Sequence, residues 1–182
     1  MEALAVHDIR VIIFYGHFVL RDVWCDAGDD GESLRVSREQ IVAASTYQVT
    51  IQARSHVAGL RIRLWDGEPE QDSGTWDGCR QFVLHCPTGE LLVEQITSGA
   101  AAEVRLPQGA GVYGLRIHWA DQEAVQKAIM GVYQRLDGQP QDALTAALRE
   151  LDGTERFLID AWWQRPLPPD DDDDEFHSDD WI

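Results

Sequence analysis

The fold class of this chain is decided by one stretch, Val104-Arg105-Leu106-Pro107-Gln108-Gly109 followed by Val112-Tyr113-Gly114-Leu115-Arg116-Ile117-His118-Trp119. On both sides of its turn signal, apolar residues stand at every second position and alternate with arginine or histidine. A period of two places successive side chains on opposite faces of a strand, so that one face is buried and the other is solvated. The stretch therefore predicts two antiparallel strands that contribute one face to a core.

The same alternation extends outward through most of the chain. Leu60, Ile62 and Leu64 alternate with arginines, and turn signals such as Asp66-Gly67 separate the apolar segments. We predict strands near residues 10–15, 17–23, 33–36, 47–55, 59–65, 79–86, 90–97, 102–107 and 111–119. Many short strands without intervening helices favour an antiparallel β-sandwich, and the nearly continuous apolar run Val11 to Leu20 predicts a central position for the first two strands.

The period changes after Ala120. Apolar residues at helical spacing predict one helix from Asp121, a candidate N-cap, to Leu136 and a second from Pro140 to Leu151. Residues 154–164 return to an apolar, strand-like pattern. We therefore expect one mainly β domain over residues 1–165, a sandwich of about 8–10 strands, with a helical hairpin inserted at 121–153 before the last strand.

The charge is strongly acidic, with 32 Asp and Glu against 15 Lys and Arg and a formal net charge of −17. Eight of these acids lie in residues 170–182, and without them residues 1–169 carry −9. Prolines at 166, 168 and 169 precede this acidic run, so we expect residues 166–182 to be a disordered, solvated tail. Such a field repels phosphate backbones and argues against direct nucleic-acid binding.

The remaining composition indicates a cytoplasmic protein. No apolar run approaches a membrane span, and the N-terminus has no signal-peptide pattern, so we expect no membrane association. The three cysteines are an odd number and favour a reducing compartment over a disulfide scaffold.

Catalytic and metal-binding motifs are not evident in the sequence. Cys79, His85 and Cys86 lie close together, but their spacing is not that of a metal site, and Cys86 points away from the other two on a strand. There is no Gly-x-Ser-x-Gly turn, and the single lysine, Lys127, falls within a predicted helix rather than after a phosphate-binding loop. We therefore expect a non-enzyme without cofactor or metal.

Seven tryptophans raise a second possibility, a carbohydrate or small-ligand module. We expect Trp65, Trp119 and Trp162 to face the core, with Trp163 on the face opposite Trp162. Trp24 and Trp76 fall in loops, where exposed rings could stack on sugars. Six arginines are expected at outward strand positions, making one solvent face locally basic or salt-bridged: Arg54, Arg61, Arg63, Arg80, Arg105 and Arg116.

The acidic segments are the candidate partner-binding residues. Carboxylates attract a basic protein at long range, and aromatic side chains set among them can anchor it on contact. In the tail the candidates are Asp170, Asp171, Asp172, Asp173, Asp174, Glu175, Phe176, Asp179, Asp180 and Trp181. In the acidic loop they are Glu68, Glu70, Asp72, Trp76 and Asp77.

The order of strands and turns resembles that of the bacterial competence protein J family over about residues 10–120 and 154–164. The resemblance is carried by Tyr15-Gly16-His17-Phe18-Val19-Leu20, a helix-like stretch at Val36–Val42, the turn at Cys86–Glu90, the stretch quoted first, and Arg156–Trp162. It implies a small acidic β-sandwich that inhibits a DNA-entry nuclease by binding it. The helical hairpin and the acidic tail depart from the family's compact form.

The leading hypothesis is thus a non-enzymatic, acidic inhibitor or immunity-type protein whose partner is a basic protein such as a nuclease or nuclease toxin. The alternatives are the carbohydrate or small-ligand module, and a soluble domain without a dedicated partner.

Overall fold

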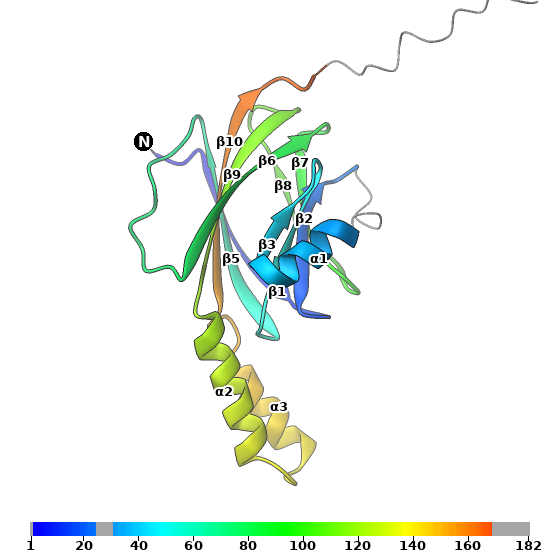
Figure 1. The fold of residues 1–182 in the computed structure, drawn as a ribbon, viewed down its shortest axis with the longest axis vertical. Helices are drawn as coiled ribbons and strands as arrows, with labels where there is room; N and C mark the ends of the chain where they lie inside the picture. The colour runs from blue at the N-terminus through cyan, green and yellow to red at the C-terminus, as the bar shows by residue number, and fades with distance from the viewer. Residues whose placement is uncertain (1, 25–30, 169–182) are drawn as a thin grey trace, which may run out of the picture.

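The computed structural model describes residues 2–24 and 31–168 and consists of two facing β-sheets with three helices (Figure 1). The first sheet, sheet A, has the spatial order β1 (Ala5–Ile12), β5 (Val57–Trp65), β10 (Arg156–Arg165), β9 (Gly111–Ala120), β6 (Gly78–Cys86). The second, sheet B, has the order β3 (Val42–Ala44), β4 (Gln48–Gln52), β2 (His17–Asp22), β7 (Glu90–Gln95), β8 (Gly99–Arg105). The mainly β sandwich predicted from the alternating pattern is confirmed.

The core lies between the two sheets and is built from the apolar residues of the alternating pattern. Leu60, Ile62 and Leu64 of β5 face it, as do Leu115 and Ile117 of β9. Opposite them, sheet B contributes the inward residues of β2, β4 and β7, and Phe18 of β2 meets Phe157 of β10 with ring centroids 5.4 Å apart. Burial of these side chains is the main stabilising term of the sandwich.

Sheet A is mixed rather than purely antiparallel. Its last strand in sequence, β10, lies in the middle of the sheet, antiparallel to β9 and parallel to β5. A parallel neighbour requires a long crossover connection, which the intervening strands and the inserted helices supply.

The predicted helical hairpin is confirmed as α2 (Gln122–Arg135) and α3 (Gln141–Arg149), immediately before β10. It extends beyond the end of the sandwich (Figure 1). Only Gln122, Val125 and Val132 are buried in α2, and α3 has no buried residue. Asp121 holds the N-cap position but makes no side-chain cap, because its carboxylate accepts hydrogen bonds from Arg156 of β10 instead.

Helix α1 (Gly31–Gln40) corrects the strand predicted at 33–36. It packs on sheet B through hydrogen bonds between small polar groups: the Ser33 hydroxyl lies 2.9 Å from that of Thr50, and the Gln52 side chain donates to the Ser37 hydroxyl at 2.7 Å. A helix held by a polar interface needs no apolar stripe, so the sequence of residues 33–36 lacks the spacing that indicates a helix. The helix-like stretch noted in the family resemblance overlaps it.

The prediction that residues 11–20 lie centrally is half wrong. The two strands do not pair with each other: β2 is the middle strand of sheet B, whereas β1 is an edge strand of sheet A. The predicted tail, 166–182, lies outside the described residues from residue 169 onward.

Candidate functional site

The outer face of sheet A carries charged and aromatic side chains rather than ordinary surface polar ones. The residues that alternate with the core residues project there: Arg61, Arg63 and Trp65 from β5, Arg116 and His118 from β9, and Leu158, Asp160 and Trp162 from β10. The β5–β6 loop, residues 66–77, contributes the acidic groups that meet them.

Asp160 is the centre of this layer. It is fully buried, and its register partners are Arg63 on β5 and Arg116 on β9. Its carboxylate accepts hydrogen bonds from Arg63 Nε at 2.6 Å, Arg63 Nη2 at 2.9 Å and Trp65 Nε1 at 2.8 Å. A buried carboxylate is tolerated only with such compensation, so Arg63 and Trp65 are fixed in place by it.

The β5–β6 loop binds back to the sheet through Asp72. Its carboxylate lies 2.9 Å from Arg63 Nη1 and accepts hydrogen bonds from the Trp76 indole at 3.0 Å and the Gly74 amide at 2.8 Å. The hydrogen bond from Trp76, together with those from Gly74 and Arg63, lowers the pKa of the Asp72 carboxyl against the opposite effect of burial.

Two further acids of the loop are also engaged within the chain. Glu68 lies 2.6 Å from Arg116, whose guanidinium also donates to the Pro69 carbonyl at 2.8 Å. Asp77 accepts a hydrogen bond from the Asp121 amide at 2.7 Å. Of the five loop residues predicted to bind a partner, Glu68, Asp72, Trp76 and Asp77 therefore have internal contacts, while Glu70 is exposed.

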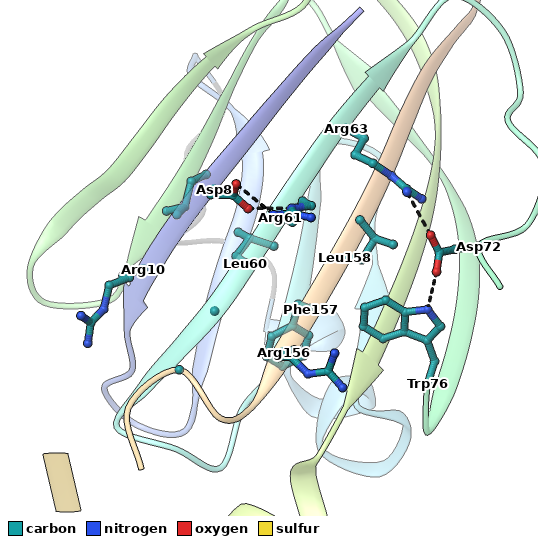
Figure 2. A pocket seen from close by; sticks show the side chains of 13 residues that line it. Asp8, Arg10, Leu60, Arg61, Arg63, Asp72, Trp76, Arg156, Phe157 and Leu158 are labelled. Carbon is teal, nitrogen blue, oxygen red and sulfur yellow. Dashed lines mark hydrogen bonds and ion pairs between the residues drawn. The ribbon is translucent and has the colours of Figure 1, made fainter. Parts of the chain in front are cut away.

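A groove of about 570 Å³ opens on this face beside the loop (Figure 2). Its lining includes four arginines, Arg10, Arg61, Arg63 and Arg156, together with Asp8, Asp72 and Trp76. Each of the four arginines has a carboxylate partner: Arg10 with Asp152, Arg61 with Asp8, Arg63 with Asp160 and Asp72, and Arg156 with Asp121. The groove is therefore lined by arginines that are already ion-paired, and it is not an open cationic site.

Cys79 and His118 lie beside the other end of the loop. The Cys79 sulfur is 3.8 Å from His118 Nε2, and the Trp76 ring lies against the imidazole with centroids 5.3 Å apart. Burial raises the pKa of the Cys79 thiol and lowers the pKa of His118. Both shifts favour the neutral forms of the thiol and the imidazole, whereas a cysteine nucleophile needs the thiolate.

Within the described part of the chain, no three His, Cys, Asp or Glu residues are placed to hold a metal ion together. Cys79 is exposed and Cys86 buried, at opposite ends of β6. Within the same residues, no helix has the length and apolar character needed to cross a membrane.

The tryptophan positions agree only in part with the predictions. Trp119 faces the core as expected, but Trp65 and Trp162 lie on the outer face of sheet A, and Trp163 packs against the core instead. Trp162 is buried there with Arg116 stacked over its ring. Of the six tryptophans that the structure describes, only Trp24 is exposed, so these tryptophans form no extended surface on which sugar rings could stack.

The predicted outward arginines give a salt-bridged face rather than a basic one. Arg61, Arg63 and Arg116 do project outward and are ion-paired. Arg80 is a correction: its register partner Ile117 belongs to the core, and Arg80 donates to Gln40 of α1. Arg54 follows β4, and Arg105 ends β8 in an exposed position.

The partner-binding residues predicted in the tail, 170–176 and 179–181, lie outside the described residues. The structure therefore places the loop part of the predicted surface but not the tail part. Sequence reasoning missed Asp160 and its bonds to Arg63 and Trp65. An aspartate at an outward position between apolar neighbours in a predicted strand was the available signal.

By its architecture the chain is a two-sheet, mainly β sandwich protein, with a helical hairpin before the last strand and a charged outer face on sheet A. No family model matches the chain, and no curated protein matches its sequence. Among solved structures the chain is similar to ComJ from Bacillus subtilis, described as the inhibitor of the DNA-degrading activity of NucA, with a TM-score of 0.56 and 15% identity over 90% of this chain and 98% of ComJ.

The chain is also similar to the structure titled crocagin biosynthetic gene J, with a TM-score of 0.54 and 16% identity over 89% of this chain and 100% of that one. The resemblance to the competence protein J family is thereby confirmed as a likeness of fold.

Proposed function

We propose that this chain is a non-enzymatic inhibitor that binds a basic protein in the cytoplasm, and that a nuclease or nuclease toxin is that partner. The observation that supports this most directly is the fold: over nearly its whole length the chain shares its architecture with a protein described as a nuclease inhibitor. In the Cys79–His118 pair, the strongest catalytic candidate in the described residues, burial raises the pKa of the thiol, which disfavours the thiolate that nucleophilic attack requires.

The electrostatics of the surface agree with a cationic partner. Arg61, Arg63, Arg116 and Arg156 are compensated by carboxylates of this chain. These ion pairs are neutral as units, so the net charge of −17 comes from the acids in excess of the basic residues, and this excess is what an approaching basic protein meets. An uncompensated acidic field accelerates association with a basic protein and disfavours acidic competitors.

The proposed contact surface combines the tail from Asp170 to Trp181 with the β5–β6 loop. The loop is supported by its internal hydrogen bonds, so it offers the exposed carboxylates of Glu68 and Glu70 from a fixed backbone. The tail supplies most of the carboxylates, and Phe176 and Trp181 act as apolar anchors. Inhibition follows because these carboxylates occupy the partner's phosphate-binding cleft and exclude its substrate.

The test is to titrate the purified protein against basic nucleases of its native host and to measure DNA degradation and association rates at two salt concentrations. Replacing the eight tail acids by Asn or Gln in the full chain should slow association at least about tenfold and flatten its salt dependence. The matched control neutralises Glu123 and Asp142 on the helical hairpin and should leave the rate unchanged. An unchanged rate in the tail variant excludes the tail from the interface, and DNA degradation undiminished in every titration excludes nuclease inhibition.

A further inference from the structure

Strand β1 is an edge strand of sheet A, and along its outer backbone edge it pairs with no other strand of the described residues, although β8 of sheet B lies close to it. In the β1–β5 pairing the odd residues of β1 form the hydrogen-bonded pairs, as the bond from the Ile13 amide to the His56 carbonyl shows. The even residues therefore direct their N–H and C=O groups away from β5. The Ile12 amide there donates to the side chain of Gln95, whereas those of Val6, Asp8 and Arg10 have no acceptor within residues 2–24 and 31–168.

The same even residues have exposed side chains on the outer face of sheet A. Val6 and Ile12 are 52% and 45% exposed, unusually high for apolar residues within a strand. The pairing of β1 with β5 is continuous from Ala5 to Ile12, and the strand contains no lysine, proline or bulge. Soluble proteins often protect an edge strand with such features or with charged side chains, and on β1 the charges are one acid and one base, Asp8 and Arg10, which can pair with each other across two copies.

The order of the exposed side chains is self-complementary. Along β1 they read apolar, acidic, basic, apolar at Val6, Asp8, Arg10 and Ile12. When a second copy of β1 is aligned antiparallel to the first, an acid lies opposite a base and an apolar residue lies opposite an apolar residue. We propose that β1 pairs antiparallel with β1 of a second copy of this chain, with Asp8 opposite Arg10 of the other copy and Val6 opposite its Ile12.

This register is the one that the charges permit. The even residues must face even residues, because only their backbone groups point to the outer edge. A shift by two residues in one direction places Asp8 opposite Asp8, and in the other direction Arg10 opposite Arg10, and like charges directly opposite each other are destabilising. In the proposed register Ile9, which packs against the core cluster, lies on the two-fold axis opposite its own copy.

The ion pairs already present on β1 do not oppose this arrangement. Asp8 pairs with Arg61, and Arg10 pairs with Asp152, and both pairs lie at the surface, where Asp8 and Arg10 have side-chain exposures of 66% and 71%. A carboxylate can accept hydrogen bonds from two guanidinium groups, so Asp8 can hold Arg61 and Arg10 of the second copy together. Sheet A of one copy and sheet A of the other, each with five strands, then form one continuous sheet across the two-fold axis.

The test is the mass of the full chain in solution, measured by sedimentation over a range of concentrations. The native chain should be a dimer, and the single reversals Asp8→Arg and Arg10→Asp should each raise the dimer dissociation constant at least about tenfold. The double variant carrying both reversals restores the complementary order and should restore the native dissociation constant. Val6→Lys, an edge-protecting change without charge reversal, should also give a monomer.

The matched control is Glu103→Arg, a reversal of an exposed charge on the edge strand β8 of the other sheet, and it should leave the dimer intact. The proposal is overturned by a native monomer at all concentrations, by a dimer that survives both single reversals, or by a double variant that remains monomeric while circular dichroism shows it folded. Because no partner protein is used, these outcomes are independent of the proposed inhibition.

Discussion

Arg63 and Asp160 lie opposite each other across the parallel β5–β10 pair, joined by hydrogen bonds of 2.6 and 2.9 Å, with the carboxylate fully buried. The same guanidinium reaches outward to Asp72, so this pair connects the centre of sheet A to the loop that covers it. The placement of the β5–β6 loop therefore depends on a buried residue in a strand about ninety positions away in sequence.

Replacing Asp160 by alanine should destabilise the protein by about 3 kcal/mol, because the partly buried Arg63 and the Trp65 indole lose their shared acceptor. The free energy of unfolding in urea measures this loss. Glu123→Ala is the control, since it breaks the exposed ion pair with Lys127 on α2 and should have a much smaller effect. Equal losses in the two variants would contradict the central role of Asp160.

The attachment of the β5–β6 loop should weaken in acid. The pKa of Asp72 is lowered in the folded state, so its stabilising contribution is complete above the ordinary value of 3.8 and is lost as the pH falls through the lower folded value. The Trp76 indole N–H resonance should therefore shift below pH 3.8. In Asp72→Asn, which keeps an acceptor for the indole but has no titrating group, that shift should be absent. A pH-independent resonance in the native protein would contradict the assignment.

Two glycines should respond in opposite directions to alanine. A Cβ at Gly114 of β9 would collide with the buried Trp162 ring, so Gly114→Ala should cost about 1–3 kcal/mol. Gly131 lies inside α2 with open space around its Cβ position, so Gly131→Ala should stabilise the helix by up to about 1 kcal/mol. Thermal unfolding of both variants measures the difference. A stabilising Gly114→Ala would show that Trp162 is not held where the structure places it.

The helical hairpin should open more easily than the sandwich. Helix α3 buries no residue, whereas all ten residues of β9 are buried. Backbone amides of α3 should therefore exchange with deuterium through local opening, long before those of β9, which require global unfolding. Hydrogen exchange measured by mass spectrometry separates the two. Protection of α3 equal to that of β9 would indicate that the hairpin is packed against something in solution.

The alternating segments were predictable because one face of each strand is apolar and the other polar, as in Leu60 to Leu64 and Leu115 to Trp119. The order of the strands in the sheets was not predictable, because nothing in the sequence of residues 156–165 indicates that this strand lies between β5 and β9. The sequence pattern did not predict helix α1, because Ser33 and Ser37 contact polar side chains on sheet B and the helix therefore has no apolar stripe.

The candidate site was predicted from composition alone, and composition does not reveal pairing. Glu68 and Asp72 belong to an acidic loop, but their partners Arg116 and Arg63 come from two different strands and become neighbours only in the folded sheet. Trp65 and Trp162 were predicted to face the core from alternation and from the large area that each can bury. Alternation with the core residues Leu64 and Ala161 instead places both rings on the outer face, where stacked guanidinium groups cover them.

The central position of β10 has a consequence for biosynthesis. Until residues 156–165 leave the ribosome, β5 and β9 cannot gain the neighbour that joins them, and the nascent chain carries an incomplete sheet with two unsatisfied strand edges. Sheet A is thus completed only after β10 has been made and has inserted between β5 and β9.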